Sequence, residues 1–451
     1  MFRREEIAGR SSCRMRAILE KPTLVLALLL LTATAAHAVK TPEGGNQGTT
    51  PTACQTSCRS DDFKCCARLK FLELQPIFAR FDNFWVLGHS FDTVLDYFTY
   101  VDPSAAPGFA PVALDRYDST VAAGNCWYDD GSWWAIAALK ASQSGLFDAF
   151  DSGRFLGIAE SLWRPIQHHA PNVWANATPE WSALEPRFSG GVWNYFWTKE
   201  KNASICNTPC PGVGLCGIQN TVTNGLYLIL ASRMFLKSQD PGAQQSAADE
   251  YEFFDQWFRT EPTSLLNRPA TGGAVVRERV GVYASGAAAD GYDPALAWAG
   301  DQGLVLGGLV DQMTISGSGP VYEDQLQYAK EIAVGAQGYL STGGALQPWK
   351  PSPPANDPCD YATGPGVFMR NVLHAHQTNA DLKAFLQISG YPAFVRQNAR
   401  LVFEGKQYRL TSSCWGVPSG AMPQVINLTN DLATLVAAAA FDSSSGFPDS
   451  R

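Results

Sequence analysis

Residues 127–139 have the sequence WYDDGSWWAIAAL, in which two adjacent aspartates precede a run of apolar and small side chains. A helix that is apolar on nearly all sides must be enclosed by other helices. The same order, a polar cluster followed by an apolar helical run, recurs along the chain and predicts six enclosed helices. These six segments are 83–100, 128–142, 219–235, 301–312, 366–376 and 427–441.

Helices of a second kind separate the enclosed ones, because several intervening segments have a single apolar face. In 247–259, Tyr251, Phe254 and Phe258 share one face, while Glu250 and Asp255 lie elsewhere on the helix. Each helical hairpin then hides its apolar surface only against neighbouring hairpins. We therefore expect an all-α (α/α)6 toroid of six helical hairpins. Similar amphipathic patterns occur at 71–78, 155–162, 322–333 and 394–402.

The first 38 residues have the organisation of a cleavable signal peptide. A basic region precedes the apolar run 23–31, and Ala36-His37-Ala38 follows as a small-residue cleavage site. The apolar run is shorter than the roughly 20 residues that cross a bilayer. We expect a signal peptide at 1–38, a cysteine-rich segment at 39–70 and the toroidal domain at 71–445. The protein is then secreted, with no membrane anchor after signal cleavage.

Cysteine usage fits an oxidising compartment. Of the 11 cysteines, ten remain once Cys13 is removed with the signal peptide, and an even number favours disulfides. Cysteines 54, 58, 65 and 66 form a dense cluster that predicts a disulfide-rich N-terminal extension. A zinc site is the alternative, but no histidine stands beside these cysteines. Sequons at Asn176, Asn202 and Asn427 predict a glycoprotein.

The charge balance limits the class of partner. The formal net charge is −8 at pH 7, and 12% of the residues are aromatic. An acidic surface repels nucleic acid phosphates and suits a neutral ligand such as a sugar. We expect a polysaccharide partner, no nucleic acid and a monomeric protein. The chemistry considered below requires no cofactor and no metal.

A polar cluster lies at the N-terminal end of each enclosed helix. Enclosed helices run parallel in such a ring, so their polar starts should meet at one mouth and form a binding site. Aromatic side chains near this mouth can pack on the C–H faces of sugar rings. The predicted ligand contacts are Trp127, Tyr128, Trp193, Asn220, Asn224, Trp298, Asp301, Gln302, Arg370 and Trp415.

Asp129 and Asp130 are the candidates for catalysis. Glycoside hydrolysis needs one carboxylic acid to protonate the leaving oxygen and one carboxylate to attack or to activate water. A retaining mechanism places the two groups only about 5 Å apart, a separation that adjacent side chains at a helix start can achieve. The alternative is structural, because an aspartate before a helix is often only an N-cap. Asn220 and Asn224 are open to the same capping interpretation.

These motifs resemble those of glycoside hydrolase family 76, the endo-α-1,6-mannanases, which includes fungal cell-wall transglycosidases. The resemblance is most specific in residues 127–139 and continues with GGVW at 190–193, the Asn-xxx-Asn start at 220–224 and WAGDQG at 298–303. It extends over roughly residues 80–440. It implies an (α/α)6 fold and a retaining mechanism, with Asp129 as nucleophile and Asp130 as acid/base.

Two positions depart from the pattern expected for that family. Gly300-Asp301 stands where Tyr-Asn is expected, and Gly364-Pro365 stands where Phe-Lys is expected. The sequence thus predicts a secreted retaining glycoside hydrolase acting on α-1,6-linked mannan or a related mannose-containing polysaccharide. One alternative is transglycosylation, in which a sugar hydroxyl replaces water as the acceptor. The other is a noncatalytic glycan-binding protein on the same scaffold.

Overall fold

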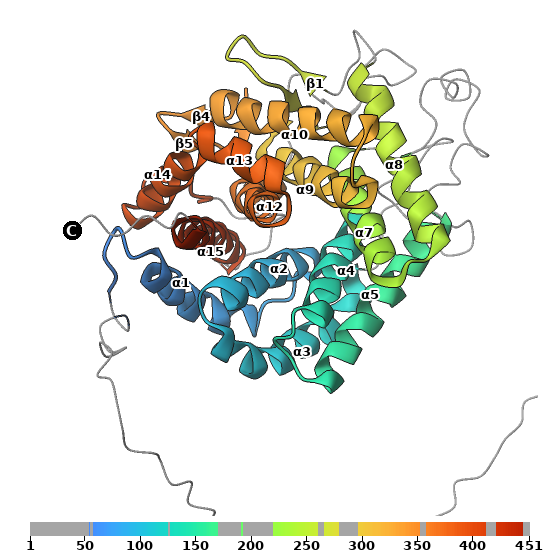
Figure 1. Ribbon diagram of the computed structural model, residues 1–451. Helices are drawn as coiled ribbons and strands as arrows, with labels where there is room; N and C mark the ends of the chain where they lie inside the picture. The colour runs from blue at the N-terminus through green and yellow to red at the C-terminus, as the bar shows by residue number, and fades with distance from the viewer. Residues whose placement is uncertain are drawn as a thin grey trace, which may run out of the picture. The chain divides into compact units, whose positions relative to one another are not determined.

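Six buried helices form a closed inner ring in the computed structural model, which describes residues 54, 57–124, 127–169, 191–192, 220–259, 266–278, 296–351, 358–411 and 421–444. Each inner helix packs against the next, and the last packs against the first, so that the ring closes (Figure 1). The six predicted enclosed helices are therefore confirmed. They are α2 (Phe84–Tyr100), α4 (Tyr128–Gln143), α7 (Thr221–Ser238), α9 (Ala299–Ser316), α12 (Gly364–Thr378) and α15 (Ala421–Ser444).

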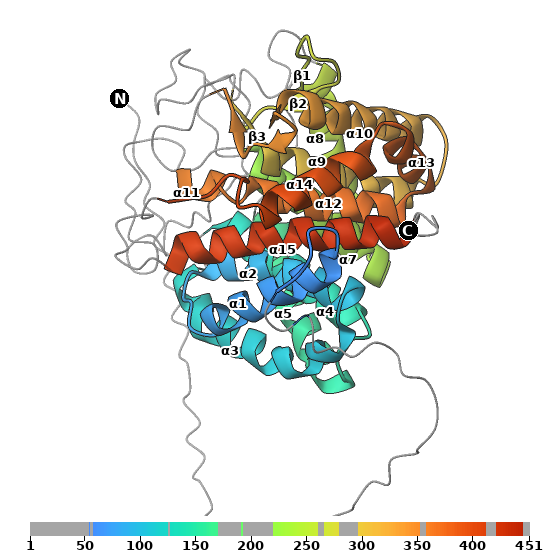
Figure 2. The same ribbon diagram turned by 90° about the vertical axis from the view of Figure 1, so that its left-hand side faces the viewer.

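A second layer of helices surrounds the ring, and its members pack on the inner helices beside them. The last inner helix, α15, takes its outer partner from the other end of the domain, since α1 packs along it. Figure 2 shows α15 running past α1 and α2. The all-α toroid predicted from the sequence is confirmed. The outer helices are α1 (Phe63–Phe78), α3 (Ala106–Gly124), α5 (Ala149–His169), α8 (Pro241–Arg259), α10 (Pro320–Tyr339), α13 (Ala380–Ile388) and α14 (Tyr391–Phe403).

The outer helix α3 was not predicted, because no apolar periodicity marks its residues. Its first two turns contain Pro107 and Pro111, which are more typical of a turn than of a helix. Pro107 is tolerated because the first turn of a helix needs no intrahelical N–H donor. The 3-10 helix η2 (Pro103–Ala105) leads directly into this turn. Phe109 is fully buried against the rings of Phe78 and Phe91, and this packing stabilises the helix despite its prolines.

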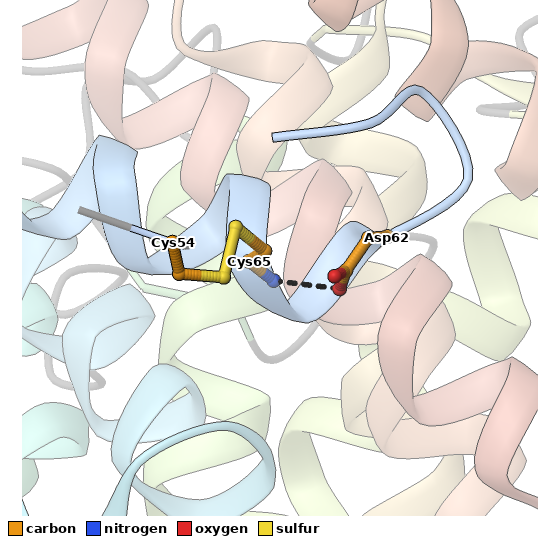
Figure 3. A group of neighbouring side chains, drawn as sticks. All are labelled: Cys54, Asp62 and Cys65. Atoms are coloured by element: carbon orange, nitrogen blue, oxygen red, sulfur yellow. Dashed lines mark hydrogen bonds between the residues drawn. A yellow bond between two sulfur atoms is a disulfide. The ribbon is translucent and has the colours of Figure 1, made fainter. Parts of the chain in front are cut away.

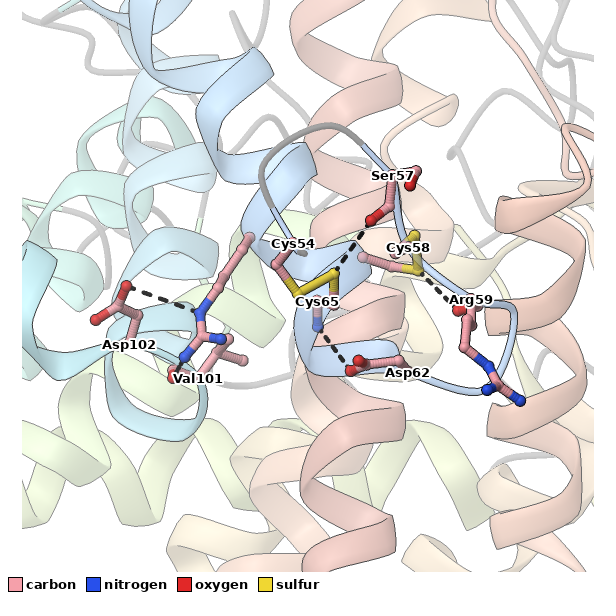
Figure 4. The surroundings of a disulfide bond; sticks show 10 residues. Cys54, Ser57, Cys58, Arg59, Asp62, Cys65, Val101 and Asp102 are labelled. Atoms are coloured by element: carbon pink, nitrogen blue, oxygen red, sulfur yellow. Dashed lines mark hydrogen bonds and ion pairs between the residues drawn. A yellow bond between two sulfur atoms is a disulfide. The ribbon is translucent and has the colours of Figure 1, made fainter. Parts of the chain in front are cut away.

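Two disulfides tie the residues before α1 to its first turn. Asp62 caps the helix, and its Oδ1 accepts the N–H of Cys65 at 3.0 Å (Figure 3). Cys65 is bonded to Cys54, and Cys66 to Cys58, so the sulfur atoms beside Asp62 are not thiolate metal ligands (Figure 4). The disulfide interpretation of this cluster is confirmed. Because α1 begins at Phe63, the expected boundary between 70 and 71 lies inside a helix of the toroid.

Short strands connect the helices near one end of the ring. β1 (Leu266–Asn267) pairs with β2 (Val275–Val276), β3 (Ala297–Trp298) with β6 (Trp349–Lys350), and β4 (Ser341–Thr342) with β5 (Ala345–Leu346), all antiparallel. β3 leads into α9, and the short helix α11 (Pro358–Tyr361) leads towards α12. Among the described helices, none combines the length and the apolar character needed to cross a membrane.

Side-chain amides hold several connecting segments against the helices. Gln302 on α9 accepts the N–H of Val276 at 2.7 Å and donates to its carbonyl at 2.8 Å. Asn224 on α7 binds both backbone groups of Val192 in the same way, at 2.7 and 3.1 Å. Each amide thus satisfies a backbone donor and a backbone acceptor in the buried interior. Amides that bind connecting backbone similarly are Asn398, Asn427 and Asn430.

One predicted glycosylation site is used in this way. The Nδ2 of Asn427 donates to the carbonyl of Leu410 at 3.0 Å, while its Oδ1 accepts the Leu410 N–H at 3.0 Å. A glycan on Nδ2 would break the first of these bonds. The other two sequons, at Asn176 and Asn202, lie outside the described residues and stay predictions.

Replacing Gln302 by leucine should destabilise the segment around Val276. The change leaves a buried N–H and a buried carbonyl without a partner, which costs about 2 kcal/mol. Hydrogen–deuterium exchange should show faster exchange in 275–278, and urea denaturation a lower midpoint. Gln327→Leu is the matched control, because Gln327 is exposed on α10 and its side-chain partner among the described residues is Glu331. Equal exchange rates in both variants would contradict the role assigned to Gln302.

Candidate active site

A cavity of about 450 Å³ opens at the N-terminal ends of the inner helices. This volume falls in the range of roughly 300–1,000 Å³ that is typical of ligand sites. The starts of α2, α4, α7 and α9 contribute side chains, and α11 completes the wall. In the described part of the chain, the lining residues are Asn83, Trp85, Trp127, Asp129, Asp130, Trp133, Asn220, Val222, Glu278, Trp298, Asp360 and Tyr361.

The first turn of α4 carries the two aspartates into this cavity. Trp127 is extended and ends the preceding segment, so Asp129 and Asp130 occupy the helix N-terminus, where negative charge is favoured. The Oδ1 of Asp129 accepts the N–H of Asp130 at 3.0 Å. Its Oδ2 accepts the hydroxyl of Thr223, from α7, at 3.3 Å. No described residue donates a hydrogen bond to the carboxyl group of Asp130.

The environment separates the two carboxyl groups electrostatically. Burial raises the pKa of Asp129 to about 6, against the lowering effect of its hydrogen bonds from backbone N–H groups and from Thr223. Burial also raises the pKa of Asp130 well above its usual range, and the charges of Asp129 and Asp360 add to this effect. Of this coupled pair, Asp130 therefore holds its proton more tightly and Asp129 ionises first, as expected for two neighbouring acids.

Aromatic rings form much of the remaining wall. Trp127 is 38% exposed, and the ring of Trp133 lies 6.4 Å from that of Trp85. Trp298 meets Tyr361 edge to face at 5.9 Å, and its Nε1 donates to the Tyr361 carbonyl at 2.7 Å. Flat apolar rings beside carboxyl and amide groups match the two kinds of surface that a pyranose presents.

Two glycines make room for the ring of Trp298. A Cβ added at Gly300 would lie 2.3 Å from the indole, and one at Gly364 would lie 2.6 Å from its Nε1. Both contacts are closer than real Cβ atoms come. These are the two positions at which the sequence departs from the pattern expected for family 76. The two departures are therefore linked, because both accommodate the same indole ring at the cavity wall.

The structure brings together only some of the predicted ligand contacts. Trp127, Asn220 and Trp298 line the cavity with the two aspartates. Asn220 also caps α7, so this residue both caps a helix and lines the cavity. Two of the predicted contacts, Trp193 and Trp415, lie outside the described residues. The remaining predicted contacts are buried and do not line the cavity; they are Tyr128, Asn224, Asp301, Gln302 and Arg370.

Arg370 belongs to a buried charge network beneath the cavity. Its Nε lies 2.8 Å from Oδ2 of Asp92, whose Oδ1 also pairs with Lys140 at 2.8 Å. Burial alone would raise the pKa of Asp92, but Arg370 and then Lys140 hold it well below its usual range. The guanidinium lies 5.7 Å from the ring centre of Trp133, a lining residue. Arg370 thus neutralises an internal carboxylate and supports the cavity floor from below.

Several lining residues were not among the predicted contacts. Asn83 begins the first of the six repeated segments and caps α2, so its place at the mouth followed from the same reasoning as that of Asn220. Glu278 follows β2 in a connecting segment, and Asp360 and Tyr361 lie on α11, a helix of four residues that is too short to show periodicity. No pattern in the sequence marks them.

Arg370→Met should reduce stability strongly. Among the described residues it leaves Lys140 as the ion-pair partner of the buried Asp92, and breaking a buried ion pair costs about 3 kcal/mol. Arg154→Met is the control, since Arg154 pairs with Asp118 at the exposed surface and should cost less than about 1 kcal/mol. Urea denaturation of both variants measures the difference. A loss for Arg370→Met no larger than for the control would refute the network.

No family model matches this chain, and no curated protein matches it in sequence. Solved structures do match its fold. An inactive variant of the α-1,6-mannanase GH76A of Salegentibacter sp. HEL1_6, in complex with α-1,6-mannotetrose, has a TM-score of 0.56 at 16% identity, covering 84% of this chain and 99% of that one. Dfg5 from Chaetomium thermophilum, in complex with glucosamine, has a TM-score of 0.57 at 12% identity, covering 87% and 91%. The Lin0763 protein from Listeria innocua has a TM-score of 0.57 at 16% identity, covering 84% and 98%. These likenesses show the fold expected from the sequence.

Proposed function

We propose that the protein is a retaining glycoside hydrolase that cleaves α-1,6-linked mannan or a related mannose-containing polysaccharide. The observation that carries the proposal is the adjacent pair Asp129 and Asp130 in an aromatic-walled cavity, where Asp130 holds its proton more tightly than Asp129 does. Two solved structures of similar fold are inactive α-1,6-mannanase variants, each with two consecutive aspartates replaced, bound to α-1,6-mannotriose and α-1,6-mannotetrose. They support the substrate class through the fold.

The reaction uses the two carboxyl groups in two steps. Asp129 attacks the anomeric carbon, the glycosidic C–O bond breaks, and Asp130 gives its proton to the leaving sugar oxygen. The product is a glycosyl ester on Asp129. Asp130, now ionised, then removes a proton from water, and the resulting attack on the anomeric carbon releases the sugar and restores both carboxyl groups.

The charges in the cavity favour a ligand without phosphate. Asp129, Asp130, Glu278 and Asp360 line it, and no lysine or arginine does so among the described residues. Among the described lining residues, a phosphorylated ligand would meet acidic groups and no cation, at a cost that a neutral sugar avoids. The disulfides at α1 support the accompanying proposal of secretion, because such bonds persist in oxidising compartments.

Transglycosylation uses the same ester on Asp129 but resolves it with a sugar hydroxyl in place of water. Product length on linear α-1,6-mannan separates the two outcomes. Shorter oligosaccharides alone indicate hydrolysis, whereas products longer than the substrate indicate transfer. Binding of mannan with no release of reducing ends over a long incubation would indicate a noncatalytic protein.

Asp129→Asn and Asp130→Asn should each abolish most of the activity on α-1,6-mannan. Loss of the nucleophile or of the proton donor removes a group that acts in the transition state, so kcat should fall by about a thousandfold or more. A reducing-sugar assay measures this. Asp115→Asn serves as the control, because Asp115 is exposed and its ion-pair partner in the described part of the chain is Arg116. Equal activity of all variants and wild type would remove both assignments.

The pH dependence of kcat/KM should be bell-shaped. Activity requires Asp129 to be ionised, so it should fall below about pH 6, roughly tenfold per unit, as that carboxylate takes up a proton. On the alkaline side it should fall as Asp130 loses its proton, at a pH well above the usual aspartate range. Initial rates measured at low substrate concentration between about pH 4 and 9 test this prediction. A profile that stays flat down to about pH 4 would contradict the assigned ionisation of Asp129.

A further inference from the structure

Thr223 contacts the reacting pair from a different helix. It lies on α7, is 1% exposed, and its Oγ1 stands 3.3 Å from Oδ2 of Asp129. Among the described residues Asp129 is the only hydrogen-bond partner of this hydroxyl. The other oxygen of the carboxylate, Oδ1, is held by the backbone N–H of Asp130. One donor from α4 and one from α7 therefore fix the two oxygens of Asp129.

The start of α7 is built to present this hydroxyl. Asn220 caps the helix, and its Oδ1 accepts the backbone N–H of Thr223 at 3.2 Å. Thr223 is consequently the third residue of α7, in the turn that packs beside α4. Asn220 itself lines the cavity. The cap thus ties the position of Thr223 to the cavity wall.

We propose that Thr223 is a positioning residue whose hydroxyl orients the Asp129 carboxylate for attack on the anomeric carbon. The catalytic part of this inference rests on the proposed function. The hydroxyl donates to one oxygen and leaves the second lone pair of each oxygen available to a sugar. Asp130 receives no such donor from the described residues, so Thr223 also distinguishes the nucleophile from its neighbour.

The same bond favours the ionised form of Asp129, because a donor to a carboxylate stabilises its charge. The other titratable groups that line the described part of the cavity are Asp130 on α4, Glu278 after β2 and Asp360 on α11, and all three are acids. Burial raises the pKa of Asp129, and the Thr223 hydroxyl acts against this effect.

Three variants separate a hydroxyl role from a packing role. Thr223→Val keeps the shape and removes the hydroxyl, whereas Thr223→Ser keeps the hydroxyl and removes a methyl group. Thr223→Ala repeats the valine test if the valine variant folds poorly. The control is Thr434→Val, because Thr434 is buried on α15 and its hydroxyl binds the Asn430 carbonyl, away from the cavity lining.

Two readouts are compared. Carbon-13 NMR of protein labelled at the aspartate side-chain carboxyl, assigned with Asp129→Asn, reports the titration of Asp129 whether or not the protein is active. The pH profile of kcat/KM on α-1,6-mannan reports the catalytic consequence. In Thr223→Val the midpoint of the Asp129 titration and the acid limb of the kcat/KM profile should both move to higher pH, by about half a unit to one unit. At pH values on the acid side of the profile, kcat/KM of Thr223→Val should be about threefold to tenfold lower than that of the wild type. The loss should lie in kcat, with KM nearly unchanged.

Thr223→Ser should leave the NMR midpoint and the acid limb where the wild type has them, and so should Thr434→Val. The proposal is overturned if Thr223→Val leaves the Asp129 titration unchanged, or if the serine variant shifts it as much as the valine variant. If the wild type releases no reducing ends from mannan, the proposed function fails, and the NMR titration alone still decides whether Thr223 governs Asp129. If the wild type is active and the titration does not move, only the role of Thr223 fails.

Discussion

An inner helix of this protein hides its apolar surface only when it has a neighbour on each side. α9 illustrates the constraint, because its residues from Ala299 to Met313 are all buried. Such a helix cannot be stable at the edge of an open array, so the six inner helices form a closed ring. Because the ring is closed, the N-terminal ends of the inner helices lie together at one end of it, which is the mouth of the cavity. The position of the cavity is thus a consequence of how the apolar surface is buried.

The depth of a polar residue along its inner helix is one determinant of what it does. Asn83, Asp129 and Asn220, at the cap or in the first turn, reach the cavity, whereas Asp301 in the first turn of α9 is buried and does not line it. Gln302 and Asn224, slightly further along, bind the backbone of the segments that surround the mouth. Arg370, in the second turn of α12, lies inside the ring and pairs with Asp92. The sequence pattern places all these polar residues at the starts of the inner helices, and that is correct. It does not show which of them reach the cavity and which bind other parts of the protein.

The sequence predicted the fold well because the signal was repeated. Six apolar runs with alternating amphipathic helices leave few other ways to bury the apolar surface, and the inner helices lie close to the predicted ranges. Prediction failed where tertiary packing overrides local preference, as in the proline-containing start of α3. It also missed Glu278 and Asp360, because their places in the cavity depend on connecting segments that only the folded ring brings near. Thr223 was overlooked beside Asn220 and Asn224, although the cap at Asn220 places it against α4.

In the proposed mechanism Asp129 forms a bond to the sugar while Asp130 supplies the proton. An α-1,6-mannobiosyl fluoride carrying fluorine at ring carbon 2 tests this directly, because the fluorine slows both steps and the fluoride leaving group needs little acid assistance, so a glycosyl ester accumulates. Peptide mass spectrometry after brief incubation and protease digestion locates the adduct. We expect one fluoromannobiosyl group on Asp129. Absence of any adduct on an active enzyme, or an adduct on Asp130, Glu278 or Asp360, would contradict the assignment.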